Sequence, residues 1–488
     1  MSSPVFVFGI SGATWSVAEP LIAAGRLPNM ARLQDGGCSA KLLSVLVDGD
    51  KHFRPQVAWA SLATGCEPQR HGVTRFYHTA DDLRVPAIWD VFAQHGRRAG
   101  IYGWPLDWPP PRVDGFVVPS HLARDTRTWP PELSCIKALD REQQNAERVG
   151  GGRSAASSRL RTARTLMDHG ARLRTLASIA ATVMRSTLLA DAEQRSLMLR
   201  RAKLDLSADL FLGLCRRFQP ELRTFHTFLV DFVSHRFWRY HEPELFADAS
   251  GESAGRFGNA VTEAYVQTDR VLGRMIAALP PGSTIAVMSE HGMRAEPEST
   301  EVGEWRYVID PLRLSALVGL ERQIVGAPVA RWIAYRSRTR EPLPTDTVER
   351  LRRVRVLETD LPLFQIHLHG RDEIVVKLSI ERSVPRYREG SLEALTLAYD
   401  DVRVPFSEVT RRLGRARSAM HDGEGMLLLA GPNIPRGMQL PDVQLVDVAP
   451  TLLAAAGLPL PRGLDGKPLF SAGLGRQDDA SLFRIRAI

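Results

Sequence analysis

The sequence of 488 residues is poor in cysteine and has no long hydrophobic run. Its four cysteines lie far apart without a C-x-x-C pair, which argues against a disulfide framework or a structural zinc knot. No stretch approaches the roughly 18 consecutive apolar residues that a membrane-spanning helix needs. The first twelve residues lack the basic start and the apolar length of a secretory signal. We therefore expect a cytoplasmic protein with reduced thiols and no membrane partner.

Basic residues outnumber acidic ones, 63 to 55, which gives a net charge of +8. They are mostly arginines dispersed along stretches with a helical pattern, as in Arg159, Arg161, Arg164, Arg172 and Arg174. This distribution is typical of solvated helix faces, and attraction of an anionic small-molecule substrate is the other interpretation. Nucleic acid is not favoured as a partner, because aromatic residues do not interleave with the arginines as a stacking platform requires. The sequence gives no indication of the oligomeric state.

Short apolar runs alternate with amphipathic segments along most of the chain. Strands are expected at residues 5–8, 98–102, 224–230, 284–288 and 426–430, with a helix at 261–278. This alternation predicts an α/β core with a mainly parallel central sheet flanked by helices. Ligands of such sheets gather at the carboxyl ends of the strands, so a site is expected there.

Two stretches depart from this alternation. The first is polar, helical and interrupted by glycine and serine, and residues 150–158 (GGGRSAASS) are expected to form a flexible link. The second is mixed, and residues 363–378 have the pattern of two strands joined by a turn around Gly370. The predicted organisation is a core made of three segments, 1–125, 207–293 and 418–488, with a helical insertion at 126–206 and a mixed α/β cap insertion at 294–417.

Acidic residues and histidines cluster next to three of the expected strands. Asp231 and His235 lie four residues apart, a spacing that places both on one side of a helical turn. Glu290 and His291 follow the strand at 284–288, and His421 precedes the strand at 426–430. One such pair alone is most simply structural. Three clusters of metal-ligand residue types at strand ends indicate a shared site.

Longer motifs occur in a fixed order between residues 5 and 469. They include GISGATWSVAEPLIAAGRLPNMARLQDGG, WASLATGCEPQRHGV, DFVSHRFWRY, VMSEHGM, HDGEGMLLLAGPNI and LVDVAPTLLAAAGLPLPRGLDGKPL. This series resembles the alkaline phosphatase superfamily, in particular its type I phosphodiesterase/nucleotide pyrophosphatase branch. The resemblance implies an alkaline phosphatase-like core in which two divalent ions, usually zinc, hold a phosphoryl group while a Thr or Ser attacks phosphorus.

The resemblance implies that one ion is held by three side chains of suitable type, Asp231, His235 and His421. At the second ion, the usual Asp–His pair becomes Glu290 and His291, and the first carboxylate becomes Ser11. Fewer carboxylates weaken binding of a second cation. We therefore expect one divalent ion, zinc or alternatively manganese, and regard a second as doubtful.

The nucleophile of the family corresponds to Pro55, four residues before Trp59, and proline offers neither a nucleophile nor a ligand. Three residues are candidates for catalysis instead. Arg54 could stabilise anionic oxygens, Glu290 could act as a general base if it is not a ligand, and Ser11 could touch substrate or metal. The preceding loop could rebuild the site or form a solvated turn, with Asp48, Asp50 and His52.

Two classes of function follow. The first is a metal-dependent enzyme that acts on a phosphorylated or nucleotide-like small molecule, by hydrolysis or group transfer, without the usual Thr/Ser nucleophile. The alternative is a catalytically silent relative that binds a ligand or a protein partner through the cleft that corresponds to the family's active site. The changes at Ser11 and Pro55 favour the silent relative, whereas the complete set of Asp231, His235 and His421 favours the enzyme.

Overall fold

A computed structural model describes most of the chain. The described residues are 3–47, 53–145, 156–189, 191–247, 249, 251–297, 307–329, 332–339, 341–370, 372–379, 392–412 and 417–470.

A mainly parallel sheet forms the centre of the molecule. Its parallel strands lie in the order β6-β1-β5-β3-β4, with bounds β1 Val5–Ile10, β3 Ala99–Tyr102, β4 Gly115–Val118, β5 Leu222–Thr227 and β6 Thr284–Ser289. Strand β19 (Glu424–Ala430) joins β6 in antiparallel orientation and carries β2 (Cys38–Leu43) on its other side. Two short strands complete the edge, β20 (Met438–Gln439) and β21 (Val443–Gln444). The predicted fold class is confirmed.

Helices cover both faces of this sheet, as expected for parallel strands whose two faces are buried. Side chains of β1 alternate between them, with Phe6 and Phe8 in one apolar core and Val5 and Val7 in the other. The first core is closed by α1 (Trp15–Ala23), α2 (Pro28–Asp35), α9 (Ala192–Phe218), α10 (Leu229–His241) and α12 (Ala260–Ile276). The second is closed by α3 (Pro55–Thr64), α5 (Ile88–Gln94) and α17 (Val448–Ala455).

The prediction of a strand at 224–230 is wrong for its last three residues. Strand β5 stops at Thr227, whose Oγ1 accepts a hydrogen bond from the Leu229 amide (3.2 Å), and helix α10 begins at Leu229. The apolar run Phe-Leu-Val suggested strand, but Phe228 is the N-cap residue and Leu229 and Val230 form the buried side of the first helical turn. The correction matters because it places Asp231 inside a helix.

The helical insertion consists of α6 (Ser134–Asn145), α7 (Ala156–Asp168), α8 (Leu173–Leu189) and the start of α9. Of the expected flexible link, residues 150–155 lie outside the described residues, and 156–158 open α7. Helix α9 runs through the predicted boundary at 206 and packs against the core as far as Phe218. The domain boundaries stay predictions. None of the described helices combines the length and apolar character needed to cross a membrane.

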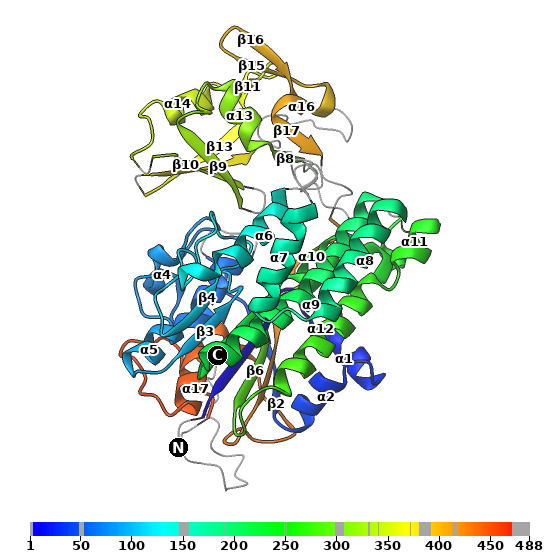
Figure 1. The fold of residues 1–488 in the computed structure, drawn as a ribbon, viewed down its shortest axis with the longest axis vertical. Coiled ribbons are helices and arrows are strands. Elements are labelled where there is room, and N and C mark those ends of the chain that lie inside the picture. Colours follow the sequence, from blue (N-terminus) through cyan, green and yellow to red (C-terminus); the bar gives the residue numbers. More distant parts are fainter. Residues whose placement is uncertain are drawn as a thin grey trace.

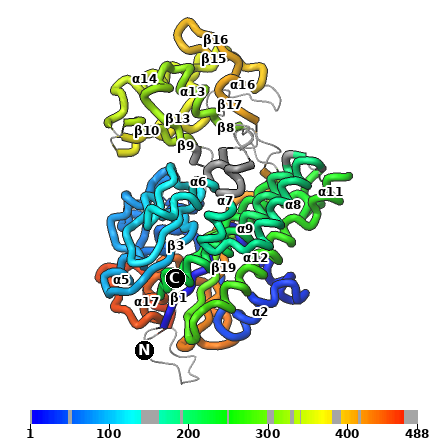
Figure 2. The backbone as a smooth tube through the Cα atoms, viewed as in Figure 1, coloured from blue at the N-terminus to red at the C-terminus, as the bar shows by residue number. Residues whose placement is uncertain are grey.

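The cap stands at one end of the core and has an apolar core of its own (Figures 1 and 2). The expected strand pair at 363–378 is present as β13 (Phe364–His369) and β14 (Glu373–Leu378), and Gly370 makes the turn with φ +64°. These strands form a sheet with β9 (Ile324–Val329) and β10 (Trp332–Ser337). The other elements are β8 Tyr307–Ile309, α13 Pro311–Leu317, α14 Thr347–Arg352, β11 Arg355–Val356, β12 Leu361–Pro362, β15 Thr396–Tyr399, β16 Val402–Pro405, α16 Phe406–Val409 and β17 Thr410–Arg412.

Charged side chains hold the cap against the core, and we call them the cap–core cluster: Asp82, Arg124, Arg336, His369 and Glu373. Glu373 Oε2 lies 2.7 Å from the Nε atoms of both Arg124 and Arg336. His369 is held between two carboxylates, with Nδ1 2.7 Å from Glu373 and Nε2 2.9 Å from Asp82. Burial alone would lower the pKa of His369, but these hydrogen bonds outweigh it and raise the pKa to about 9. At neutral pH the cluster is therefore an alternation of cations and anions.

Candidate metal centre

The expected site residues gather at the carboxyl edge of the sheet. Strand β1 begins at the end of the sheet away from the cap (Figure 1), so the parallel strands run toward the cap. Ser11 follows β1, Glu290 and His291 follow β6, and Asp231 lies in the first turn of α10 after β5. Because β6, β1 and β5 are neighbours, these three chain segments meet at one edge.

Asp231, His235 and His421 converge, and we call them the ligand triad. His235 lies one helical turn after Asp231, and His421 comes from β18 (Ala419–Asp422), which pairs with β7 (Gly292–Ala295). Asp231 Oδ1 lies 3.3 Å from His235 Nε2 and 3.2 Å from His421 Nε2, and the two Nε2 atoms are 3.0 Å apart. The side chains are 6 to 18% exposed, so the triad is largely buried but keeps some access to solvent.

Hydrogen bonds to backbone carbonyls fix the tautomers of both histidines. His235 Nδ1 lies 2.7 Å from the Ala419 oxygen, and His421 Nδ1 lies 3.2 Å from the Phe53 oxygen. A carbonyl can only accept, so each Nδ1 carries the proton and each Nε2 of a neutral ring is a lone-pair acceptor. Three acceptor atoms then face one another at 3.0–3.3 Å. Such a contact is repulsive unless a cation lies among them.

The protonation states agree with this arrangement. Burial lowers the pKa of His421 to about 3 and also lowers that of His235, so both rings are neutral near pH 7. Asp231 is a carboxylate near pH 7, because its side chain ionises at about pH 4. The triad thus presents one carboxylate and two imidazole lone pairs.

This donor set fits a divalent metal ion. Ligand distances of about 2.0–2.2 Å at tetrahedral angles separate the ligand atoms by about 3.3 Å, close to the separations in the triad. The triad is the one group of three or more acidic, histidine or cysteine side chains among the described residues whose ligand atoms lie within 4.8 Å of one another. Three protein ligands leave positions for substrate, as in catalytic rather than structural sites.

A second buried cluster adjoins the triad. Ser11 Oγ donates to Glu290 Oε1 (2.7 Å), and Glu290 Oε1 lies 3.2 Å from His291 Nε2. The His291 ring stacks on that of His421 with ring centres 3.8 Å apart. Burial alone would lower the pKa of His291, but Glu290 outweighs it and raises the pKa to about 9. Glu290 and His291 therefore lie beside the triad but are paired with each other, and their roles as metal ligands stay predictions.

His226 belongs to the second cluster, although no motif in the sequence singled it out. It lies in β5 and is 5% exposed, with Nε2 3.0 Å from Ser11 Oγ. Because the Ser11 hydroxyl proton points to Glu290, His226 Nε2–H donates to Ser11. A histidine within a buried strand that leads into an acidic helical turn was the available sequence signal.

Pro55 and Arg54 lie at the start of α3, close to the triad. Pro55 occupies the first helical position, where its fixed φ and missing N–H are favourable, and Arg54 is the N-cap residue. The preceding residue, Phe53, supplies the carbonyl that fixes His421. Burial lowers the pKa of His367 in the cap, and nearby cations that include Arg54 lower it further. Arg54 thus lies near His367 of the cap. Asp48, Asp50 and His52 lie outside the described residues.

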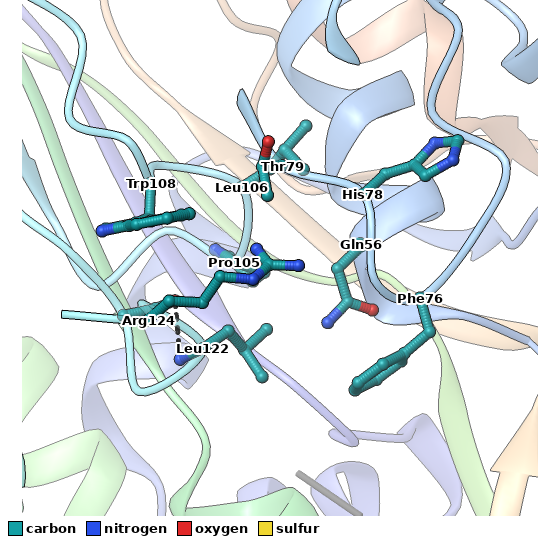
Figure 3. A pocket seen from close by; sticks show the side chains of 10 residues that line it. Gln56, Phe76, His78, Thr79, Pro105, Leu106, Trp108, Leu122 and Arg124 are labelled. Carbon is teal, nitrogen blue, oxygen red and sulfur yellow. Dashed lines mark hydrogen bonds between the residues drawn. The ribbon is translucent and has the colours of Figure 1, made fainter. Parts of the chain in front are cut away.

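A small cavity lies beside the start of α3 (Figure 3). Its walls include Gln56, Phe76, Trp108, Leu122 and Arg124, and its volume of about 10 Å³ suits roughly one water molecule. Gln56 is 2% exposed, and neither atom of its amide has a hydrogen-bond partner among the described residues. The cavity is therefore a polar pocket under the cap, next to the expected nucleophile position.

Replacing Gly12 by alanine is expected to weaken metal binding by at least about tenfold. Gly12 has φ +78°, and a Cβ there would lie 2.8 Å from the Cα of Asp231. The substitution would strain the turn after β1 and push Asp231 out of line with the histidines. Metal titration of the variant measures the effect, and Gly25→Ala is a matched control, because Gly25 has φ +70° and open space around its Cβ position. Equal metal affinity in Gly12→Ala and Gly25→Ala would contradict this role.

A mainly parallel α/β core with a carboxylate–imidazole triad at its carboxyl edge is the arrangement of α/β proteins that can hold a metal ion at this edge. The match to a family model is more specific: the chain belongs to the type I phosphodiesterase / nucleotide pyrophosphatase family, whose model matches residues 5–331, and thereby to the alkaline phosphatase superfamily. That family is typically metal-dependent and indicates phosphodiesterase- or pyrophosphatase-type activity. No curated protein matches the chain.

Proposed function

We propose that this protein is a metal-dependent enzyme that acts on a phosphorylated or nucleotide-like small molecule, by phosphoester hydrolysis or group transfer. One observation carries the proposal. The lone pairs of His235 and His421 and the carboxylate of Asp231 converge at 3.0–3.3 Å, an arrangement that needs a cation. Zinc suits two imidazoles and a carboxylate, and manganese is the alternative. When bound, the ion would polarise the phosphoryl oxygens as a Lewis acid.

The chain must use a nucleophile that does not come from Pro55. Water or a hydroxyl of the substrate remains, and either would need a base. Glu290 is the carboxylate next to the triad, and its Oε2 has no hydrogen-bond partner among the described residues. Ser11 and His291 both contact the other oxygen, Oε1, and so orient the group. Glu290 would accept the proton, and Arg54 would face anionic oxygens of the substrate from the start of α3.

Basic side chains beside the triad support an anionic substrate. The guanidinium of Arg200 stacks on Phe232, the residue after Asp231, at 3.7 Å from the ring centre. His121 contacts Phe228 at 4.2 Å, and burial together with Lys203, Lys137 and Arg200 holds the pKa of His121 well below its ordinary value. Basic groups therefore lie within reach of His121, near the start of the helix that carries Asp231 and His235, and burial lowers the pKa of one of them, Lys203, to about 7. Such a field attracts phosphorylated molecules.

A silent relative is the second candidate, and the second cluster favours it. Ser11 donates to Glu290 while His291, charged at neutral pH, pairs with the same carboxylate. The place of a second ion is thus filled by an internal ion pair, and Pro55 removes the covalent route. A protein of this kind would bind metal and a phosphorylated ligand without turnover.

Metal analysis and two esters distinguish the candidates. The purified full chain is expected to hold about one zinc or manganese ion. It should cleave a nitrophenyl phosphodiester or monoester, lose turnover with a chelator and regain it with the metal. Metal without turnover of either ester would favour the silent relative. A chain that binds neither zinc nor manganese would overturn the proposal.

A further inference from the structure

Helix α8 of the insertion exposes an unusual amount of apolar surface. Leu173, Met184 and Leu188 are 71%, 63% and 73% exposed. Ala177 and Ala180 between them are exposed as well. At about 100° per residue these five side chains fall within an arc of about 80°, so they form one continuous stripe along the helix. We call them the apolar stripe. Leucines and methionines normally face the core of a surface helix, not the solvent.

The core-facing side of α8 is already occupied. Thr175 and Ser186, on the opposite side, are buried, and Thr175 Oγ1 donates to Asp209 of α9 (2.6 Å). Helix α8 packs along α9 at the outside of the core (Figure 1). The apolar stripe therefore points away from the protein and is not a misplaced part of its interior.

Arginines border the apolar stripe along one side. Arg174 and Arg185 lie there at helical spacing and are exposed, whereas Arg172 precedes the helix and pairs with Asp209 of α9. Helix α8 contains no acidic residue, and residues 156–189 contain six arginines against one acidic residue, Asp168. An apolar face bordered by long cationic side chains is the pattern of a helix that lies in the interface of a membrane. The arginines can reach the headgroups while Leu and Met enter the acyl boundary.

We propose that α8 docks this protein onto an anionic lipid surface through the apolar stripe. A second copy of the chain is a poorer occupant, because a symmetric contact would bring the arginines of one helix against those of the other. A protein partner would have to supply a groove that matches the whole stripe, whereas a lipid surface needs only the apolar face and its arginines. The expectation of no membrane partner came from the lack of a spanning run, and a helix that lies flat on the surface needs none.

Vesicle flotation tests this docking. The full chain is expected to float with vesicles of phosphatidylcholine mixed with phosphatidylglycerol, and much less with phosphatidylcholine alone. The variant Met184→Gln/Leu188→Gln should lose at least about tenfold of its binding, because two large apolar side chains no longer leave water. Arg174→Gln/Arg185→Gln should lose binding in a salt-dependent way. Leu312→Gln is the matched control, since Leu312 is 55% exposed but lies in the cap.

The outcomes separate the proposed docking from its alternatives. Wild type that does not float with anionic vesicles overturns it, and so does Met184→Gln/Leu188→Gln that floats like wild type. Wild type that self-associates without floating, and becomes monomeric in that variant, would identify the stripe as a contact between copies and also overturn the proposal. An unchanged thermal unfolding midpoint in both variants shows that they fold, so a negative result does not depend on the enzymatic proposal.

Discussion

His421→Ala is expected to release the bound metal and to lower phosphoester turnover by at least about a thousandfold. His421 supplies one of three acceptor atoms, and it is the one that comes from β18 rather than from α10. Without it Asp231 and His235 remain as two ligands on adjacent helical turns, which cannot enclose an ion. Its loss would therefore affect metal affinity first and turnover as a consequence.

Metal content and turnover should be measured on the same preparation. His95→Ala is the matched control, because His95 is exposed at the end of α5 and bonds its own helix through the Val91 oxygen (2.8 Å). The control should keep both metal and turnover. Metal retained in His421→Ala at the wild-type stoichiometry would show that the ion binds elsewhere, and the ligand triad would not be the metal site.

The sequence predicts the features of this site that depend on local spacing. Asp231 and His235 are four residues apart, and any helix over them brings the side chains together. The meeting with His421 is different, since it depends on how β18 pairs with β7. The strand ends indicated a shared site, and the family resemblance specified these three ligands. His226 was missed for a related reason. His226 belongs to the site because it contacts Ser11, which is 215 residues away in sequence. No periodicity in the sequence encodes that contact.

The cap–core cluster could not be predicted at all. His369 has the pattern of an ordinary histidine on a strand, and Glu373 that of the first residue of the next strand. Their partners Asp82 and Arg124 lie nearly 300 and 250 residues earlier, in the core. Burial of Glu373 to 1% exposure is set by the docking of the cap, with its own apolar core, onto the rest of the protein. The local sequence patterns of the core and of the cap do not predict which charged residues pair across such an interface.

Glu373→Gln is expected to destabilise the protein by about 3–5 kcal/mol, because it removes one member of a buried ionic group. The amide keeps the shape of the side chain but leaves Arg124, Arg336 and His369 facing a neutral group. Denaturant unfolding measures the change, and protease sensitivity of the cap reports where it occurs. Glu393→Gln is the matched control. Glu393 is 52% exposed and pairs with Arg412 at 3.4 Å, so its loss should cost under about 1 kcal/mol.

The pH dependence of stability provides a second readout of Glu373→Gln. The pKa of His369 is raised from 6.5 to about 9 in the folded protein. A raised pKa stabilises the folded state fully below pH 6.5, and this stabilisation is lost as the pH rises toward 9. Glu373→Gln takes away one of the two carboxylates that raise the pKa, so its stability should fall less steeply than that of wild type across this range. Equal stability and equal pH dependence in the two proteins would show that the cap is held by its apolar contacts and not by these charges.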